Sequence, residues 1–209
     1  AKRASAPAQI NIPRDMWTQV IDIDLPAIVE FERPSGGDNA ISEAAEMLSS
    51  SKNPIILNGA GVVLSEGAID ASKALAERLD AAVCVGYQHN DAFPGSHPLF
   101  AGPLGYNGSK AAMELIKDAD VVLCLGTRLN PFSTLPGYGI DYWPKDAKII
   151  QVDINPDRIG LTKKVSVGII GDASLVANKI LSKLSDTAGD FNRTERKQKI
   201  AEIKSRWAQ

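Results

Sequence analysis

The sequence predicts an α/β protein with a Rossmann-like, doubly wound parallel sheet sandwiched between helices. The first indication is that apolar runs of strand length alternate with helical patterns through the middle of the chain. The second is that these runs are apolar at successive positions, which is typical of parallel strands buried on both faces. Because crossovers between parallel strands are right-handed, the doubly wound sandwich is the simplest arrangement of such a series.

The predicted elements begin at Asn39, which is expected to cap a helix that extends to about Ser51. Five strands are then predicted, at 55–58, 82–85, 121–125, 149–152 and 165–170. Helical patterns separate several of them, at 66–79, 109–117 and 174–184. The segment 86–108 is expected to be one long irregular loop, and such loops are usually functional or mobile.

The two flanks of this series differ from its middle. Residues 8–13 alternate like a strand that has no partner in the chain, and 14–38 suggest an extended linker laid along a surface. A flexible tail is the alternative for 14–38, but Trp17 and its apolar neighbours disfavour a solvated tether. A final helical pattern places Ile200, Ile203 and Trp207 on one stripe that needs a cover. We therefore interpret the chain as a middle piece of a longer protein.

Composition excludes several function classes. The 209 residues carry a formal net charge of −2, so nucleic acid is not an expected partner. The sequence has neither an apolar run of membrane-spanning length nor a signal-peptide pattern, which predicts a cytoplasmic protein with no membrane partner. Cys84 and Cys124 lie inside apolar runs, and we expect buried thiols rather than a disulfide or a metal pair.

Ligands of open parallel sheets bind beyond the carboxyl ends of the strands. Six residues at the predicted strand ends form a candidate nucleotide crevice: Gly59, Gly61, Gly105, Arg128, Asp153 and Asp172. Glycines before a helix suit a phosphate, Arg128 could pair with a diphosphate, and the two aspartates could accept hydrogen bonds from ribose hydroxyls. The alternative for each is structural, since glycine is common in tight turns and aspartate commonly caps helices.

The dinucleotide fingerprint itself is incomplete. Its third glycine is replaced by Leu64, and the second strand ends in Gly86 rather than an acidic residue, which disfavours a nicotinamide oxidoreductase. The sequence also lacks H-E-x-x-H, C-x-x-C, P-loop and G-x-S-x-G motifs. Its two histidines, His89 and His97, lie in the predicted loop, where surface or capping roles are expected; His89 is the better candidate for function.

Four segments in this order resemble the central domain of thiamine-diphosphate-dependent enzymes of the acetolactate synthase and pyruvate oxidase group. They are "PIILNGAGV", "GPLGYNGSKAAMELIKDADVVLCLGTR", "IIQVDINPDRIG" and "GIIGD". Within this group, "QINIPRDMWTQVIDIDLP" and "GYQHNDAFPGSHPLFAGPLGYNGSKAAMELI" look most like the sulfoacetaldehyde acetyltransferase family. The resemblance implies the fold type of the DHS-like NAD/FAD-binding domains.

The resemblance also implies a domain plan. Residues 1–13 would be the last strand of a pyrimidine-binding domain, 14–38 a linker and 39–186 the central domain; 187–209 would lead to a diphosphate-binding domain. The parent would use thiamine diphosphate and Mg²⁺, bound outside this chain, on a small-molecule substrate and phosphate, and would work as a homodimer or homotetramer. The catalytic Glu and the G-D-G metal motif of the family are not in the chain, so it is expected to be inactive alone.

In the relatives this domain holds FAD, or ADP or CoA, which carries the nucleotide role over to the six crevice residues. The family's Phe-Asp-Asp-Arg and Met-His positions differ here, and we expect Tyr106, Asn107, Phe132 and His89 to shape a substrate channel. Packing at a domain interface is an equal alternative for these positions. A mainly architectural domain with a vestigial crevice is favoured over a nucleotide-binding one, and a sirtuin-like NAD domain is disfavoured because its zinc-binding Cys pairs are missing.

Overall fold

The computed structural model describes residues 7, 9–186, 188 and 193–207, and the chain divides into two compact units at 33/34. In the first unit, a single turn of 3₁₀ helix, η1 (Arg14–Met16), interrupts an otherwise irregular backbone. Residues 9–13 were expected to be a strand but form none here, because a strand needs a neighbouring backbone to pair with. The apolar side chains from Trp17 to Phe31 are exposed, and the domain assignments of this flank stay predictions.

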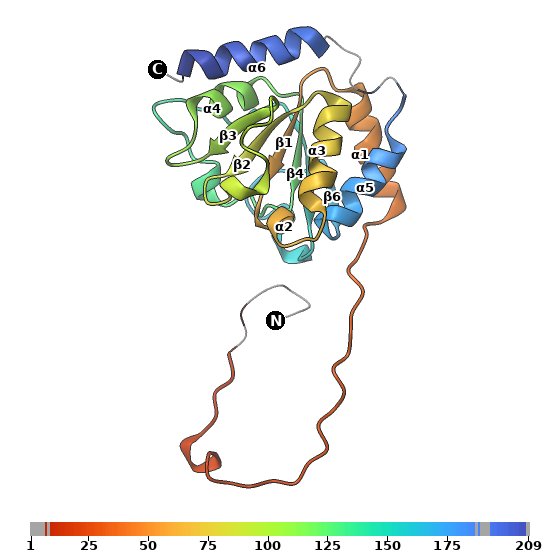
Figure 1. Ribbon diagram of the computed structural model, residues 1–209, viewed down its shortest axis with the longest axis vertical. Helices are drawn as coiled ribbons and strands as arrows, with labels where there is room; N and C mark the ends of the chain where they lie inside the picture. The colour runs from red at the N-terminus through yellow and green to blue at the C-terminus, as the bar shows by residue number, and fades with distance from the viewer. Residues whose placement is uncertain (1–6, 8, 187, 189–192, 208–209) are drawn as a thin grey trace. The chain divides into compact units, whose positions relative to one another are not determined.

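The second unit contains a six-stranded, wholly parallel sheet of order β3-β2-β1-β4-β5-β6 (Figure 1). Its strands are β1 (Pro54–Asn58), β2 (Ala82–Gly86), β3 (Phe100–Leu104), β4 (Val121–Leu125), β5 (Lys148–Asp153) and β6 (Val167–Ile170). This order winds outward from the centre in both directions, so the predicted doubly wound α/β fold is confirmed. The direction reverses between β1 and β4.

The prediction of a single irregular loop over 86–108 is wrong, because β3 and a short 3₁₀ turn, η2 (Asn90–Ala92), lie within it. β3 includes Gly102 and Pro103, two residue types that are depleted in strands and that conceal its pattern. The strand lies at the edge of the sheet, where proline is tolerated, and it pairs with β2 through a register shift beside Val83.

The helices α1 (Asp38–Ser50), α3 (Ala68–Leu79) and α5 (Ala173–Lys183) lie side by side as one layer (Figure 1). The helix α4 (Lys110–Lys117) packs over β2 and β3. The connection from β1 to β2 through α3 and the connection from β3 to β4 through α4 run in opposite directions along the sheet. Because both crossovers are right-handed, their helices lie on opposite faces, and α4 covers the second face. Asn39 does not cap α1 as expected, since the helix begins one residue earlier, after Gly37.

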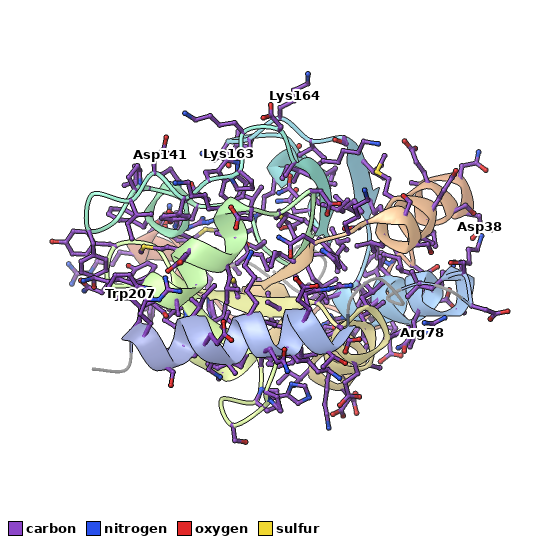
Figure 2. All side chains as sticks on the ribbon, turned by 90° about the horizontal axis from the view of Figure 1, so that it is seen from above. Asp38, Arg78, Asp141, Lys163, Lys164 and Trp207 are labelled. Carbon is purple, nitrogen blue, oxygen red and sulfur yellow. The ribbon has the colours of Figure 1, made fainter. Side chains whose placement is uncertain are left out.

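The last helix, α6 (Arg193–Trp207), packs on α4 within the same unit (Figure 2). Ile200 and Ile203 are buried within this unit, so the chain itself covers this part of the predicted apolar stripe, while Trp207 remains 40% exposed. Glu114 on α4 accepts hydrogen bonds from Trp207 Nε1 and Arg206 Nη1, both at 2.8 Å. The helix is therefore part of this unit's packing.

The sheet interior is apolar and includes both cysteines as free, buried thiols, as expected. Burial raises the pKa of Cys84 to about 12 and also raises the pKa of Cys124, so both remain protonated at neutral pH. Within the described part of the chain, every helix is too short or too polar to cross a bilayer.

One carboxylate organises the amino edge of the sheet. Asp120, just before β4, accepts hydrogen bonds from Lys52 N at 2.7 Å, from Asn53 N at 3.0 Å and from the Ser51 hydroxyl. Partial burial opposes ionisation, but these hydrogen bonds outweigh it and lower the pKa of Asp120. The side chain thereby fixes the start of β1 against the start of β4.

Candidate functional site

The turn after β1 packs directly against the turn after β4, at the point where the winding direction of the sheet reverses. Gly61 N donates to Gly126 O at 2.8 Å, and Gly59 N donates to Leu125 O at 3.0 Å. A Cβ on Gly61 would lie 2.6 Å from Gly126 Cα, and a Cβ on Gly59 would lie 2.5 Å from Thr127 Cβ. The following helix, α2 (Ala60–Val63), has only four residues. Backbone packing therefore accounts for both glycines without a phosphate.

Asp172 is the N-cap of α5, as one of the two sequence alternatives proposed. Its Oδ1 accepts hydrogen bonds from Ser174 N at 3.0 Å and Leu175 N at 3.3 Å. The same atom accepts a 2.6 Å bond from the hydroxyl of Ser65 in the turn that precedes α3. This carboxylate therefore joins two segments of the fold, which accounts for its position structurally.

The guanidinium groups of Arg158 and the exposed Arg128 lie near enough to Asp153 for their charges to favour its ionised form, and we call these three residues the charge cluster. Asp153 ends β5, is 4% exposed, and accepts a 2.9 Å hydrogen bond from Asn155 N. Burial raises the pKa of Asp153, and the Asn155 bond and the charges of Arg158 and Arg128 offset only part of that rise. Arg158 was not predicted as a site residue, although its position five residues after Asp153 in "DINPDR" was a usable signal.

Gln151 is a second residue that the sequence analysis did not single out. It is 1% exposed on β5 and joins two loops. Its Nε2 donates to Thr127 O at 3.1 Å and to Arg158 O at 3.0 Å, and its Oε1 accepts from Gly160 N at 2.8 Å. The signal was one polar letter inside the apolar run "IIQVD".

Three aromatic residues, Tyr87, Tyr106 and Phe132, form what we call the aromatic lip. Tyr106 N donates to Phe132 O at 3.0 Å, and the rings of Tyr87 and Phe132 lie 6.4 Å apart between centroids. Gly105 has φ +105°, and a Cβ there would collide with Phe132 O, so this contact requires glycine. Tyr106 is 68% exposed, Phe132 is 54% exposed, and Asn107 is exposed beside them.

The half-buried His89 lies on the turn after β2, where its backbone N–H donates a hydrogen bond to Gly86 O at 2.9 Å. The buried Asn58 of β1 supports this turn, since its Nδ2 donates to Ala92 O at 3.0 Å and to Ser72 Oγ at 2.8 Å. His97, by contrast, has its Nε2 3.2 Å from Glu77 Oε1, and its Nδ1 accepts a hydrogen bond from the backbone N of Leu99, so both ring nitrogens have local partners.

Metal binding finds little support in the described residues, which contain no group of three or more His, Cys, Asp or Glu side chains able to hold an ion. The cluster around Asp153 contains a single carboxylate and two cations, a donor set that repels a divalent ion. The carboxyl edge thus offers a braced charge cluster and an exposed aromatic lip, and the glycine turn between them is filled by backbone.

Comparison with known proteins identifies the class. Residues 41–180 match the family described as "Thiamine pyrophosphate enzyme, central domain", and the chain belongs to this family. The match covers the region from α1 to α5, which includes the sheet and the candidate site. The predicted resemblance to thiamine-diphosphate-dependent enzymes is confirmed.

Within this family, the chain is more similar to some individual relatives than to others. The chain is similar to sulfoacetaldehyde acetyltransferase of Roseovarius nubinhibens, with 76% identity over the whole chain and 34% of the relative. Identity to the same enzyme of Rhodobacter capsulatus is 69% over the whole chain and 35% of the relative. The acetolactate synthase large subunit of Corynebacterium glutamicum is 30% identical over 84% of the chain and 28% of that protein.

A solved structure supports the same fold. Benzoylformate decarboxylase from Polynucleobacter necessarius matches with a TM-score of 0.66 and 25% identity, over 82% of this chain and 32% of that one. The chain spans about a third of the length of the curated relatives it matches.

Proposed function

We propose that the chain is the central, non-catalytic domain of an enzyme that converts sulfoacetaldehyde and phosphate to acetyl phosphate and sulfite. The observation that carries this proposal is the identity of 76% and 69% to two sulfoacetaldehyde acetyltransferases over all 209 residues. Identity to an acetolactate synthase is 30%, which disfavours that activity for the parent. A role in taurine metabolism and a cytoplasmic location are further parts of this proposal.

In this reaction the carbon–sulfur bond of the aldehyde breaks, sulfite leaves, and phosphate receives the acetyl group. Thiamine diphosphate, when bound, supplies the carbanion stabilisation that this cleavage needs. We place it with Mg²⁺ on domains outside the chain, because the G-D-G motif is absent here and the described residues lack a metal-binding cluster. The domain plan of 1–13, 14–38, 39–186 and 187–209 and the homodimer or homotetramer belong to this proposal.

The decisive assay is sulfite release from sulfoacetaldehyde by the full-length protein, with and without phosphate. The proposal expects sulfite and acetyl phosphate in equal amounts, with both dependent on phosphate. The 209-residue chain alone is expected to release none. Turnover by the isolated chain, or full-length protein that prefers pyruvate, would refute the assignment.

Within the full-length enzyme, we propose that the aromatic lip, together with Asn107 and His89, borders the route to the reaction centre. Its exposed rings and polar neighbours suit a small charged aldehyde that must pass without being retained. Tyr106→Ala is expected to change KM for sulfoacetaldehyde several-fold while the Tm stays within about 2 °C. The matched control is Leu175→Ala, which removes an exposed apolar side chain from α5 and should change neither. Unchanged kinetic constants in Tyr106→Ala would leave the lip as an interface.

Retention of FAD, ADP or CoA is the second candidate function, and one observation favours it. The buried carboxylate of Asp153 could accept a hydrogen bond from a ligand hydroxyl, and the neighbouring Arg128 and Arg158 could bind an anionic group of the same ligand. Against it, Gly59, Gly61 and Asp172 are already used in internal contacts. The crevice is therefore proposed to be vestigial. A flavin absorption band in purified protein, or calorimetric binding of ADP, would instead favour a nucleotide-binding domain over one with a vestigial crevice.

A further inference from the structure

The side chain of Gln151 is an unusual feature of the sheet interior. It lies on β5 between apolar residues and is only 1% exposed, so bulk solvent does not reach it. A methionine of the same length would fill this space without the cost of burying an amide. A buried polar group of this kind needs hydrogen bonds, and the partners it finds show what it holds in place.

All the partners of Gln151 are backbone groups of the two loops that leave β4 and β5. The amide N–H groups reach the carbonyls of Thr127 and Arg158, and the amide oxygen receives the N–H of Gly160. The two carbonyl acceptors and one N–H donor fit only one orientation of the amide. Gly160 presents its N–H from a backbone with φ +72°, a conformation that favours glycine.

The two loops held in this way carry the two cations of the charge cluster. Arg128 directly follows Thr127, and Arg158 is itself one of the bonded residues. Both guanidinium groups act on the carboxylate of Asp153, which lies two residues beyond Gln151 on the same face of β5. A second bond between the same loops, from Thr162 Oγ1 to Leu129 O at 2.8 Å, restrains their outer parts.

We propose that Gln151 is a positioning residue that sets the spacing of Arg128 and Arg158 around Asp153. The amide ties the inner parts of two loops that share no strand pairing, and without it only the outer bond from Thr162 Oγ1 to Leu129 O would join them. The inference builds on the second candidate function, in which Arg128 and Asp153 line a nucleotide crevice, and it adds that the Gln151 amide holds this part of the crevice in shape whether or not a nucleotide binds.

The test is the titration of Asp153 in the 209-residue chain, followed by the ¹³C shift of its carboxyl and assigned with Asp153→Asn. In Gln151→Met the loops lose all three bonds, so the cations move outward and the midpoint should rise by about 0.5 pH unit. Arg158→Met should also raise it. The double variant should rise by less than the two single changes together, because Gln151 acts through Arg158.

Asn58→Leu is the matched control, because it removes an equally buried amide from β1 that bonds Ser72 and Ala92 instead. It should lose stability, as Gln151→Met does, while the midpoint of Asp153 stays at its wild-type value. Two results would overturn the proposal and leave Gln151 as a packing residue. One is an unchanged Asp153 midpoint in folded Gln151→Met, and the other is a midpoint shift in the double variant that equals the sum of the two single shifts.

A second measurement covers the case in which Gln151→Met unfolds during the acid titration. At pH 7, ¹⁵N relaxation of Gln151→Glu should show lower backbone order at Thr127 and Arg158 than at Gly160, because a carboxylate still accepts from Gly160 but repels the two carbonyls. Unchanged order at all three would contradict the tie. Neither measurement needs a ligand or turnover, so a failed sulfite assay or absent ADP binding would leave this result standing.

Discussion

Gly61→Ala is the most informative single change in this protein, since it separates the structural role of the glycine turn from a ligand role. The new Cβ would lie 2.6 Å from Gly126 Cα and 3.0 Å from Gly126 O. Non-bonded carbons normally lie about 3.5–4.0 Å apart, so the turns after β1 and β4 would have to separate by about 1 Å. The 2.8 Å bond from Gly61 N to Gly126 O would then stretch beyond hydrogen-bonding range.

The expected cost follows from these displacements. The lost hydrogen bond contributes about 1 kcal/mol, and forcing a methyl group between two packed backbones costs about 1–3 kcal/mol. The variant regains about 0.4–1 kcal/mol, because alanine restricts the unfolded chain more than glycine does. The free energy of unfolding should therefore fall by about 1–3.5 kcal/mol, with a central value of about 2 kcal/mol.

Urea denaturation of the 209-residue chain, followed by circular dichroism, measures this change. With an m-value of about 2 kcal/mol per molar, the midpoint should fall by roughly 1 M. Gly95→Ala is the control, because its Cβ meets nothing within 4 Å and its φ is not positive; stability should stay level or rise by no more than about 1 kcal/mol. An unchanged midpoint in Gly61→Ala would refute the packing account, and loss of ADP binding without loss of stability would establish a ligand role.

Two carboxylates give opposite pH predictions. Because its pKa is lowered in the folded chain, Asp120 stabilises the chain above the unfolded pKa of about 3.9 and loses that effect as the pH falls through the folded value. Asp120→Asn should therefore reduce the free energy of unfolding by about 1–2 kcal/mol at pH 7, because Lys52 N loses its acceptor. The difference between the variant and the wild type should shrink in acid, and a difference that stays constant with pH would contradict this. Asp153 has a raised pKa, so its effect on stability is most favourable below about pH 3.9 and is lost as the pH rises through the folded value. Asp153→Asn, whose oxygen can still accept from Asn155, should accordingly be more stable than wild type at pH 7 and equal to it in acid, and equal Tm values at both pH would disprove the assignment.

The architecture was predictable because it depends on local pattern. Runs such as "VVLCL" of β4 are apolar at every position, which indicates a strand covered on both faces whatever its neighbours are. The cap of α4 is equally local, since Ser109 Oγ accepts from Ala112 N three residues later. β3 escaped prediction because its pairing with β2 is made by backbone, which the residues Gly102 and Pro103 do not reveal.

The contacts at the candidate site could not be predicted from the sequence. Arg128 and Asp153 were chosen because they follow the carboxyl ends of two strands, and the charge of Arg128 does act on Asp153, but their ligand role stays a prediction. The use of Gly61 could not be inferred, because the backbone it packs against, Gly126, is 65 positions away in the sequence. Gln151 was missed for the same reason, since its partners lie on two loops whose meeting depends on the strand order.

Sequence by itself determined the layered α/β sandwich, most helix and strand positions, and the family resemblance, because each depends on residue type and short-range spacing. Only the tertiary structure decided which glycines are filled by neighbouring backbone, that α6 packs on α4, and that a buried amide holds the two arginine loops together. These outcomes depend on contacts between segments that are far apart in sequence. Such contacts exist only after the sheet has set the order and separation of its strands.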